Sequence, residues 1–220
     1  MRTVIFDLDG TLLNTIDTIA HYCNGALKKY GFNEISTDRY KKIVGNGAKL
    51  LVERALTETG DWNEADFEAV FKEYNDSYDA DTLYLTEPYK GILDMLSALK
   101  AKGYQIAVLS NKPDFATNDV VATIFGKDTF HLVRGAVEGV PLKPAPDAVY
   151  DIMNILGATK DKTIFVGDTK VDIETGKNAD LFSIGVLWGF RDEAELKGAG
   201  ADVIIDDPAD IVKIADEYMK

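Results

Sequence analysis

Short apolar runs alternate with amphipathic stretches along most of this chain of 220 residues. The runs are rich in Val and Ile with little polar alternation, which is typical of strands buried on both faces of a parallel sheet. The stretches between them carry apolar residues at helical spacing, as in Gly91–Lys102 and Pro146–Leu156. This alternation predicts a doubly wound α/β domain. Strands are expected at Thr3–Phe6, Gln105–Leu109, Thr163–Val166, Ser183–Leu187 and Asp202–Ile205, with a weaker one at His131–Val133.

One long segment interrupts the alternation. Between about residues 15 and 83 no convincing strand occurs, and Pro88 breaks the helical pattern that precedes it. We therefore expect an α-helical insertion at 15–82 in a core domain of residues 1–14 and 83–220, with a hinge near Asn14 and Leu83. The expected helices of the insertion are Ile16–Tyr30, Thr37–Val44, Ala48–Thr59 and Glu64–Tyr78.

Charge and composition exclude several classes of protein. The chain has 24 basic and 37 acidic residues, a net charge of −13, which disfavours binding to nucleic acid. Its one cysteine, Cys23, rules out an intrachain disulfide scaffold. We find no apolar run long enough to span a membrane and no apolar signal segment at the N-terminus, so we expect a cytoplasmic protein. No exposed apolar helix face is evident, and we expect a monomer or a homodimer.

Acidic residues follow two of the predicted strands. Asp7 comes directly after the first strand, where its carboxylate could act as a nucleophile or a metal ligand. Asp9 points to the same side if the chain stays extended, and a divalent cation would relieve the repulsion between the two charges. Asp168 and Asp172, after the strand at 163–166, add oxygen ligands of the kind that suits Mg²⁺.

Groups that could bind phosphate follow other strands or lie beside them. Gly10 allows close approach of the backbone, and Thr11 offers hydroxyl and amide donors. The Ser110 hydroxyl and the Asn111 amide could hold a phosphate oxygen, and Lys143 could neutralise a carboxylate and a phosphoryl group. Each group alone has a plain structural explanation as a turn, a helix cap or a solvated side chain. Their joint occurrence at one edge of a sheet favours phosphoryl transfer.

These clusters, in their order, resemble the four motifs of the haloacid dehalogenase-like hydrolase superfamily. The matching segments are Asp7-Leu8-Asp9-Gly10-Thr11, Leu109-Ser110-Asn111-Lys112, Lys143-Pro144, and Gly167-Asp168 with Asp172. The helical insertion resembles the small cap of that superfamily. Within it, the chain is most similar to the phosphoglycolate phosphatase branch, through Val44-Gly45-Asn46-Gly47 with Leu50, Leu51 and Leu56, and through Ser110-Asn111-Lys112-Pro113.

The resemblance implies a role for each site residue. Asp7 would attack phosphorus and become an aspartyl-phosphate, and Asp9 would protonate the leaving group and then activate water. Ser110 and the Asn111 amide would bind the phosphoryl group, with Lys143 steadying Asp7 and the phosphate. Mg²⁺ would be held by Asp7, the Asp9 backbone carbonyl and Asp168, with Asp172 as an auxiliary ligand. The implied substrate is a small phosphate ester, with 2-phosphoglycolate as the first choice.

Several alternatives stay open at this point. An inorganic pyrophosphatase, a nucleotidase or a β-phosphoglucomutase-like phosphomutase would use the same machinery. A receiver-like module, in which Asp7 only accepts phosphate, would need neither Asp9 nor an inserted domain. The Gly45-Asn46-Gly47 segment is either a plain turn between helices or a set of backbone amides for an anionic substrate tail.

Overall fold

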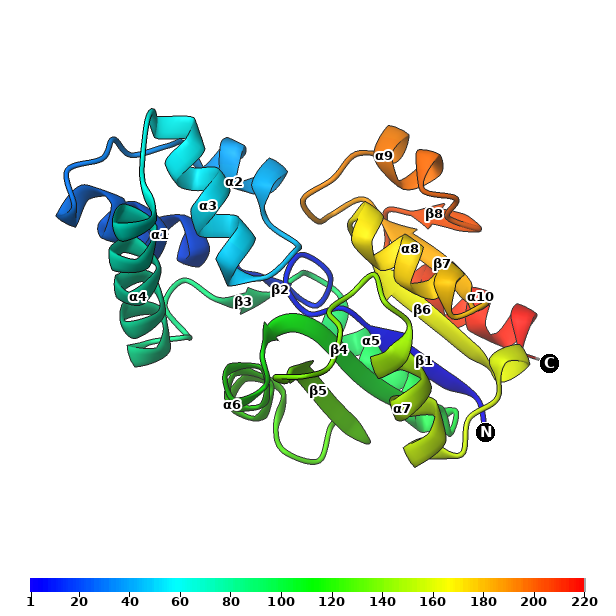
Figure 1. Ribbon diagram of the computed structural model, residues 1–220. Coiled ribbons are helices and arrows are strands. Elements are labelled where there is room, and N and C mark those ends of the chain that lie inside the picture. Colours follow the sequence, from blue (N-terminus) through cyan, green and yellow to red (C-terminus); the bar gives the residue numbers. More distant parts are fainter. Residues whose placement is uncertain (220) are drawn as a thin grey trace. The chain divides into compact units, whose positions relative to one another are not determined.

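A six-stranded parallel sheet organises the larger of two units in the computed structural model, which describes residues 1–219 (Figure 1). This unit, called the core unit below, contains Met1–Asn14 and the chain from Pro88 onward. The second unit, called the helical unit, is Thr15–Glu87. Within residues 1–219, no helix combines the length and the apolar character needed to cross a membrane.

The strand order of the sheet is β5-β4-β1-β6-β7-β8. The chain adds strands on one side of β1 as far as β5, then on the other side from β6 to β8. Ligands of open α/β sheets bind at the carboxyl ends of the strands, beside such a reversal of strand order. The strands are β1 (Thr3–Phe6), β4 (Gln105–Pro113), β5 (Leu132–Ala136), β6 (Thr163–Gly167), β7 (Phe182–Val186) and β8 (Val203–Ile205).

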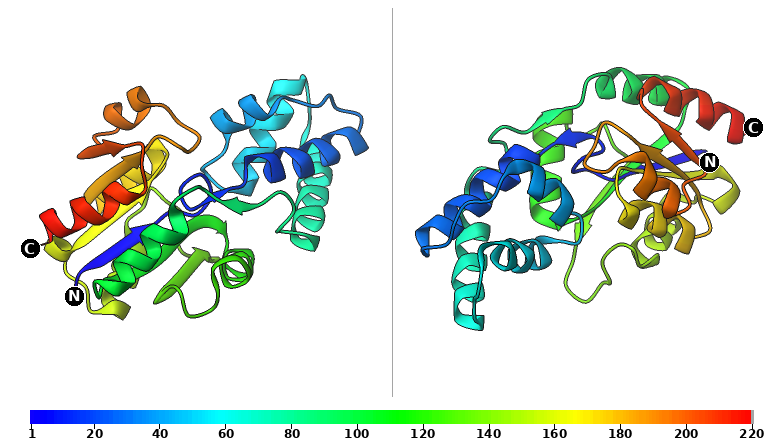
Figure 2. Two further views of the ribbon diagram at one scale, coloured as in Figure 1. Left: turned by 180° about the vertical axis from the view of Figure 1, so that it is seen from behind. Right: turned by 90° about the horizontal axis from the view of Figure 1, so that it is seen from above.

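Helices cover both faces of this sheet, which explains the uninterrupted apolar runs of its strands (Figures 1 and 2). Successive β1 side chains enter different cores: Val4 and Phe6 belong to one cluster of buried residues, and Ile5 belongs to the other. The first cluster includes α5 and α10 residues, and the second includes α7 residues. The predicted doubly wound α/β fold is therefore confirmed. The helices are α5 (Ile92–Ala101), α6 (Asp114–Phe125), α7 (Asp147–Leu156), α8 (Lys170–Asn178), α9 (Glu193–Gly198) and α10 (Ala209–Tyr218), with a 3-10 turn at Lys160–Lys162.

Strand β4 is longer than the sequence predicted. It continues to Pro113, with an irregular register against β5 between Leu109 and Pro113. Ser110, Asn111 and Lys112 therefore lie within the strand and not after it. Gly135 of β5 permits this pairing, because a Cβ there would lie 2.6 Å from the Lys112 carbonyl oxygen.

The helical unit contains α1 (Ile16–Lys29), α2 (Thr37–Ile43), α3 (Ala48–Thr59) and α4 (Glu64–Ala80). Each of these helices buries some of its residues and exposes others, and α1 buries Ile19, Cys23 and Leu27 on one face. Helix α4 begins with a capping box, in which Asn63 accepts from the backbone of Asp66 and the Asp66 side chain accepts from Asn63. All four helices lie where the apolar spacing placed them, with ends shifted by at most two residues.

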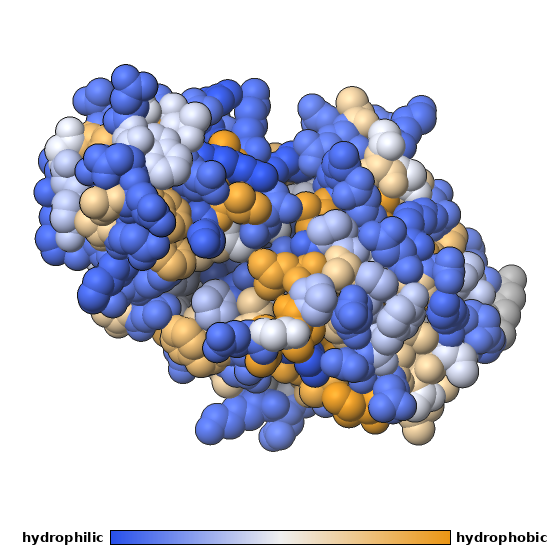
Figure 3. Space-filling view, viewed as in Figure 1, coloured by the Kyte–Doolittle hydropathy of each residue, from blue (hydrophilic) through white to orange (hydrophobic). Residues whose placement is uncertain are grey.

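The boundary of the helical unit lies at Glu87, whereas the sequence suggested residue 82. Interactions with α1 explain the difference. The Thr18 hydroxyl donates a 2.5 Å hydrogen bond to the Tyr84 carbonyl, and the Tyr84 ring packs against His21. Two short strands, β2 (Leu13–Asn14) and β3 (Glu87–Pro88), form a separate two-stranded sheet where the chain passes between the units. Hydrophilic side chains cover most of the face shown in Figure 3, as expected from the charged composition (Figure 3).

Candidate active site

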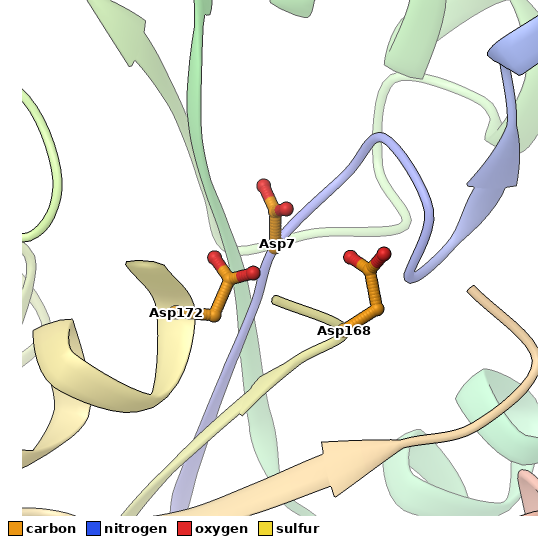
Figure 4. Close-up of side chains that lie close together, drawn as sticks. All are labelled: Asp7, Asp168 and Asp172. Carbon is orange, nitrogen blue, oxygen red and sulfur yellow. The ribbon is translucent and has the colours of Figure 1, made fainter. Parts of the chain in front are cut away.

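Three buried aspartates meet at the carboxyl edge of the central strands (Figure 4). Asp7 follows β1, Asp168 follows β6, and Asp172 lies in the first turn of α8. Strands β1 and β6 pair in parallel up to Phe6 and Val166, and the Asp7 N–H continues the ladder with a 2.9 Å bond to the Val166 carbonyl. The two strands therefore end together, and one carboxylate oxygen of each aspartate lies within 4.8 Å of those of the other two.

This concentration of negative charge shifts the titration of the group. Burial raises the pKa of Asp7 well above its usual range, and the nearby charge of Asp172 raises it further. Burial, with a contribution from Asp172, also raises the pKa of Asp168 to about 7. Burial and mutual repulsion thus disfavour the charged form of both Asp7 and Asp168.

Lys143 supplies positive charge to the group. Its ammonium lies 2.7 Å from Asp7 Oδ1 and 2.7 Å from Asp172 Oδ1, and its side chain is 3% exposed. Burial alone disfavours the charged ammonium, but Asp172 and Asp7 outweigh that cost and raise the pKa of Lys143. Lys143 is therefore a cation at neutral pH.

Asn111 holds the backbone of Lys143 from the neighbouring strand. The Asn111 side-chain carbonyl accepts from the Lys143 N–H at 2.9 Å, and its NH₂ group donates to the Lys143 carbonyl at 3.1 Å. The sequence suggested that an Asn111 amide would bind phosphate. The structure commits the side-chain amide of Asn111 to positioning Lys143.

Asp172 is fixed by the start of its own helix. The Thr169 N–H and hydroxyl donate to Asp172 Oδ2 at 3.0 and 2.6 Å, while Asp172 Oδ1 contacts Lys143. This capping box fixes the Asp172 side chain at the N-terminus of α8. Gly167 leaves room for it, because a Cβ at that position would lie 2.1 Å from the Asp172 Cβ.

Asp168 is held by the segment after β1 and by the segment after β7. The Thr11 hydroxyl donates to Asp168 Oδ1 at 3.1 Å, and the Phe190 N–H donates to Oδ2 at 2.8 Å. The Trp188 indole in turn donates to the Thr11 carbonyl at 2.9 Å. The Thr11 hydroxyl, expected to serve a substrate, is thus directed at Asp168. Gly10 has a φ of +91°, and a Cβ there would lie 2.3 Å from Asp168 Oδ2.

Asp9 lies outside the group of three carboxylates and pairs with a residue to which the sequence analysis gave no role. Lys112 Nζ lies 3.1 Å from Asp9 Oδ1, and the Lys112 side chain is 6% exposed. The Lys112 N–H also donates to the hydroxyl oxygen of buried Ser110 at 3.2 Å. Side chains two residues apart in a strand point to the same side. Because Ser110 was already expected at the site, this spacing could have predicted that Lys112 lies there too.

The three aspartates have the chemistry of a hard-cation site. Each offers carboxylate oxygens, which Mg²⁺ prefers over nitrogen or sulfur ligands. Asp7 Oδ1 is buried and, among residues 1–219, has no hydrogen bond of good geometry despite its contact with Lys143. A buried carboxylate oxygen without such a hydrogen bond is suited to coordinate a cation.

The Gly45-Asn46-Gly47 segment lies in the helical unit, between α2 and α3. Gly45 and Gly47 have φ values of +114° and +87°, which require glycine for an unstrained backbone. The Asn46 side-chain oxygen accepts from the Arg54 guanidinium at 2.9 Å, and the same nitrogen donates to the Ile43 carbonyl. Within this unit the segment is a turn held by Arg54.

Comparison with known proteins identifies the family. Residues 4–186 match the model of the haloacid dehalogenase-like hydrolases. The chain belongs to that family. A phosphoglycolate phosphatase of Aquifex aeolicus is 33% identical to it over 100% of this chain and 99% of the relative. The family and such relatives make the chain a phosphoric monoester hydrolase.

Other similar proteins extend the range of related enzymes. An N-acetylmuramic acid 6-phosphate phosphatase of Pseudomonas aeruginosa is 27% identical over 100% of this chain and 96% of the relative. The crystal structure of a predicted phosphoglycolate phosphatase from Haemophilus somnus superposes with a TM-score of 0.91, at 28% identity, over 97% of each chain. The likeness thus includes both units of the chain.

Proposed function

We propose that this hydrolase removes phosphate from a small phosphomonoester, 2-phosphoglycolate, with Mg²⁺ as cofactor and Asp7 as nucleophile. The carrying observation is the position of Asp7, buried with Asp168 and Asp172 and 2.7 Å from Lys143. The Lys143 ammonium and a bound metal would neutralise the negative charge of a phosphoryl group beside Asp7. The Asp7 carboxylate could then attack its phosphorus.

The proposed reaction has two steps. An Asp7 oxygen forms a bond to phosphorus as the bond from phosphorus to the ester oxygen breaks, and Asp9 gives its proton to the departing oxygen. Asp9 then takes a proton from the water that attacks the aspartyl-phosphate, which releases phosphate and regenerates Asp7. Lys143 and the Ser110 hydroxyl hold the phosphoryl group through both steps.

Asp7, Asp168 and Asp172, with the Asp9 backbone carbonyl, would hold the Mg²⁺ ion. When bound, it supplies the positive charge that keeps the buried aspartates ionised and offsets the charge of the phosphoryl group. Asp172 shares Lys143 with Asp7, so it also serves to place the lysine.

The name of one relative supports phosphoglycolate as the substrate, but another relative is named for a different phosphate ester. The Aquifex aeolicus relative is a phosphoglycolate phosphatase, whereas the Pseudomonas aeruginosa relative acts on N-acetylmuramic acid 6-phosphate. Backbone amides of Gly45-Asn46-Gly47 are proposed to meet the anionic tail of the substrate. We further propose that the enzyme is cytoplasmic, that it acts on a small molecule and not on nucleic acid, and that it is a monomer or a homodimer.

Phosphate release from 2-phosphoglycolate tests the proposal, measured as kcat/KM with saturating Mg²⁺ and compared with p-nitrophenyl phosphate. We expect a ratio above about 100, equivalent to about 2.7 kcal/mol of transition-state discrimination. A ratio near unity would refute the substrate and keep the phosphatase. Pyrophosphate, nucleotides and a sugar 1-phosphate complete the panel, and an isomerised sugar phosphate without phosphate release would identify a mutase.

A further inference from the structure

We propose that Lys112 forms a subsite for a negative charge on the leaving group, so that the enzyme selects phosphate esters with a carboxylate on the carbon that bears the ester oxygen. The inference rests on the proposed function, because it takes Asp9 as the acid that faces the leaving oxygen. Beyond that function, it assigns a role to Lys112 and gives a physical reason why a carboxylate-bearing ester would be preferred.

The position of Lys112 relative to Asp9 carries the inference. The Lys112 ammonium lies 3.1 Å from Asp9 Oδ1, and the Asp9 side chain is 19% exposed. Asp9 Oδ1 is buried and, over the described chain, has no hydrogen bond of good geometry. A group that receives the Asp9 proton must approach this carboxylate closely, which brings its neighbouring atoms within reach of the Lys112 ammonium.

The two lysines of the site are divided between the two ends of the ester. Lys143 is engaged by Asp7 and Asp172, so its charge serves the phosphoryl end. Lys112 is next to Asp9, so its charge serves the leaving-group end. The Asp9 carboxylate compensates the burial of the Lys112 ammonium, and this pairing keeps the lysine beside the end of the ester that leaves.

The main chain that carries Lys112 is fixed on both sides. The Lys112 N–H donates to the Ser110 hydroxyl oxygen, and the Lys112 carbonyl accepts from the Thr117 hydroxyl of α6 at 3.2 Å. Gly135 of β5 packs against the same carbonyl. Asp114 strengthens this contact by accepting from the Gly135 N–H at 2.8 Å. A subsite on such a rigid strand is preorganised, which reduces the cost of binding.

A comparison of two substrates tests the subsite. 2-Phosphoglycolate and ethyl phosphate have the same carbon count, but only the first carries a carboxylate. The readout is the ratio of kcat/KM for 2-phosphoglycolate to that for ethyl phosphate, in the wild type and in Lys112→Gln, Lys112→Met and Lys112→Arg. Glutamine can still donate to Asp9 without a charge, whereas arginine keeps the charge. Lys102→Gln is the control, because Lys102 pairs with Asp216 at 2.7 Å just before β4 begins.

Loss of Lys112 is expected to lower turnover of both esters, since it contacts Asp9. The ratio should fall at least about tenfold in the Gln and Met variants, the usual worth of a hydrogen bond to a charged group. It should recover in Lys112→Arg and stay at the wild-type value in Lys102→Gln. An unchanged ratio in Lys112→Gln would overturn the subsite and leave Lys112 as a residue that only positions Asp9.

A binding measurement decides the case if the variants are inactive or fold poorly. In the Asp7→Asn background both esters bind without turnover, and calorimetry gives their Kd values with Mg²⁺ present. Adding Lys112→Gln should raise the Kd of 2-phosphoglycolate at least about tenfold more than the Kd of ethyl phosphate. Equal weakening would reject the subsite. Failure of the proposed function has a different signature, because the wild type would then release phosphate from neither ester.

Discussion

The ammonium of Lys143 lies 2.7 Å from the carboxylate of Asp7, and both side chains are buried. The lysine is held there by the Asn111 amide through its backbone and by Asp172 through its side chain. The proposed nucleophile, its cation and the potential metal ligands are thus linked by direct contacts within the core unit.

Replacing Lys143 with methionine should reduce both activity and stability. The change leaves Asp7 and Asp172 buried without their cation, at a cost of about 3–5 kcal/mol. Equilibrium unfolding in urea at pH 8 with EDTA measures this cost. Lys160→Met removes an ion pair of the same 2.7 Å length, but Lys160 and Asp180 are exposed, so that variant should lose under about 1 kcal/mol. Equal losses in the two variants would contradict the account.

The metal-free protein should become less stable as the pH rises from about 4 to about 7. The pKa of Asp168 is raised to about 7 in the fold, against about 3.9 for a free aspartate, so the folded state binds more protons in this window. Across this window the unfolded chain releases the Asp168 proton while the folded chain keeps it, which removes stability of the order of 1–3 kcal/mol.

Removing the Asp168 carboxyl group, or supplying a cation to it, should reduce this effect. Asp168→Asn should show a smaller decline of stability between pH 5 and pH 8 in EDTA, measured by urea unfolding. Mg²⁺ should stabilise the wild type more at pH 8 than at pH 5, since it binds the ionised carboxylates. Parallel pH profiles for wild type and variant would show that Asp168 is not the titrating group.

Gly10→Ala should impair activity beyond what backbone strain explains. A Cβ at Gly10 would lie 2.3 Å from Asp168 Oδ2, in a backbone with a φ of +91°. Gly200 has a φ of +89° but only a distant neighbour, Lys177 Cε at 4.0 Å, so Gly200→Ala isolates the strain of about 1–2 kcal/mol. Gly10→Ala should also weaken the stabilisation by Mg²⁺ in thermal melts, whereas Gly200→Ala should not. If both variants respond alike to Mg²⁺, the contact with Asp168 is irrelevant.

The sequence was sufficient for the fold because its periodicities are strong. Strands such as Thr3–Phe6 are buried on both faces and read as apolar runs, and the amphipathic helices of the insertion kept their predicted limits within two residues. The end of β4 was predicted less well. Its last residues, Ser110 to Pro113, are polar or proline, and only pairing with β5 extends the strand through them. The role of Tyr84 in the helical unit likewise depends on tertiary contacts with α1.

For the site, residue types and strand ends predicted which side chains would be near one another, but not which hydrogen bonds they would make. The meeting of Asp7 with Asp168 and Asp172 follows from the parallel pairing of β1 and β6. The hydroxyl of Thr11 turns to Asp168, and the amide of Asn111 turns to Lys143, because buried polar groups take the partners that packing provides. Local spacing contains no information on such partners.

Trapping a covalent intermediate on Asp7 is the direct test of nucleophilic attack by this residue. Enzyme mixed with 2-phosphoglycolate and Mg²⁺ is quenched in acid within one turnover, and the peptide that contains Asp7 is analysed by mass spectrometry. We predict that one phosphoryl group is present on Asp7, that it disappears when substrate is exhausted, and that Asp7→Asn forms none while losing at least about 1000-fold in kcat. Undiminished turnover by Asp7→Asn, with no phosphoryl group on the wild-type peptide at any quench time, would contradict the account.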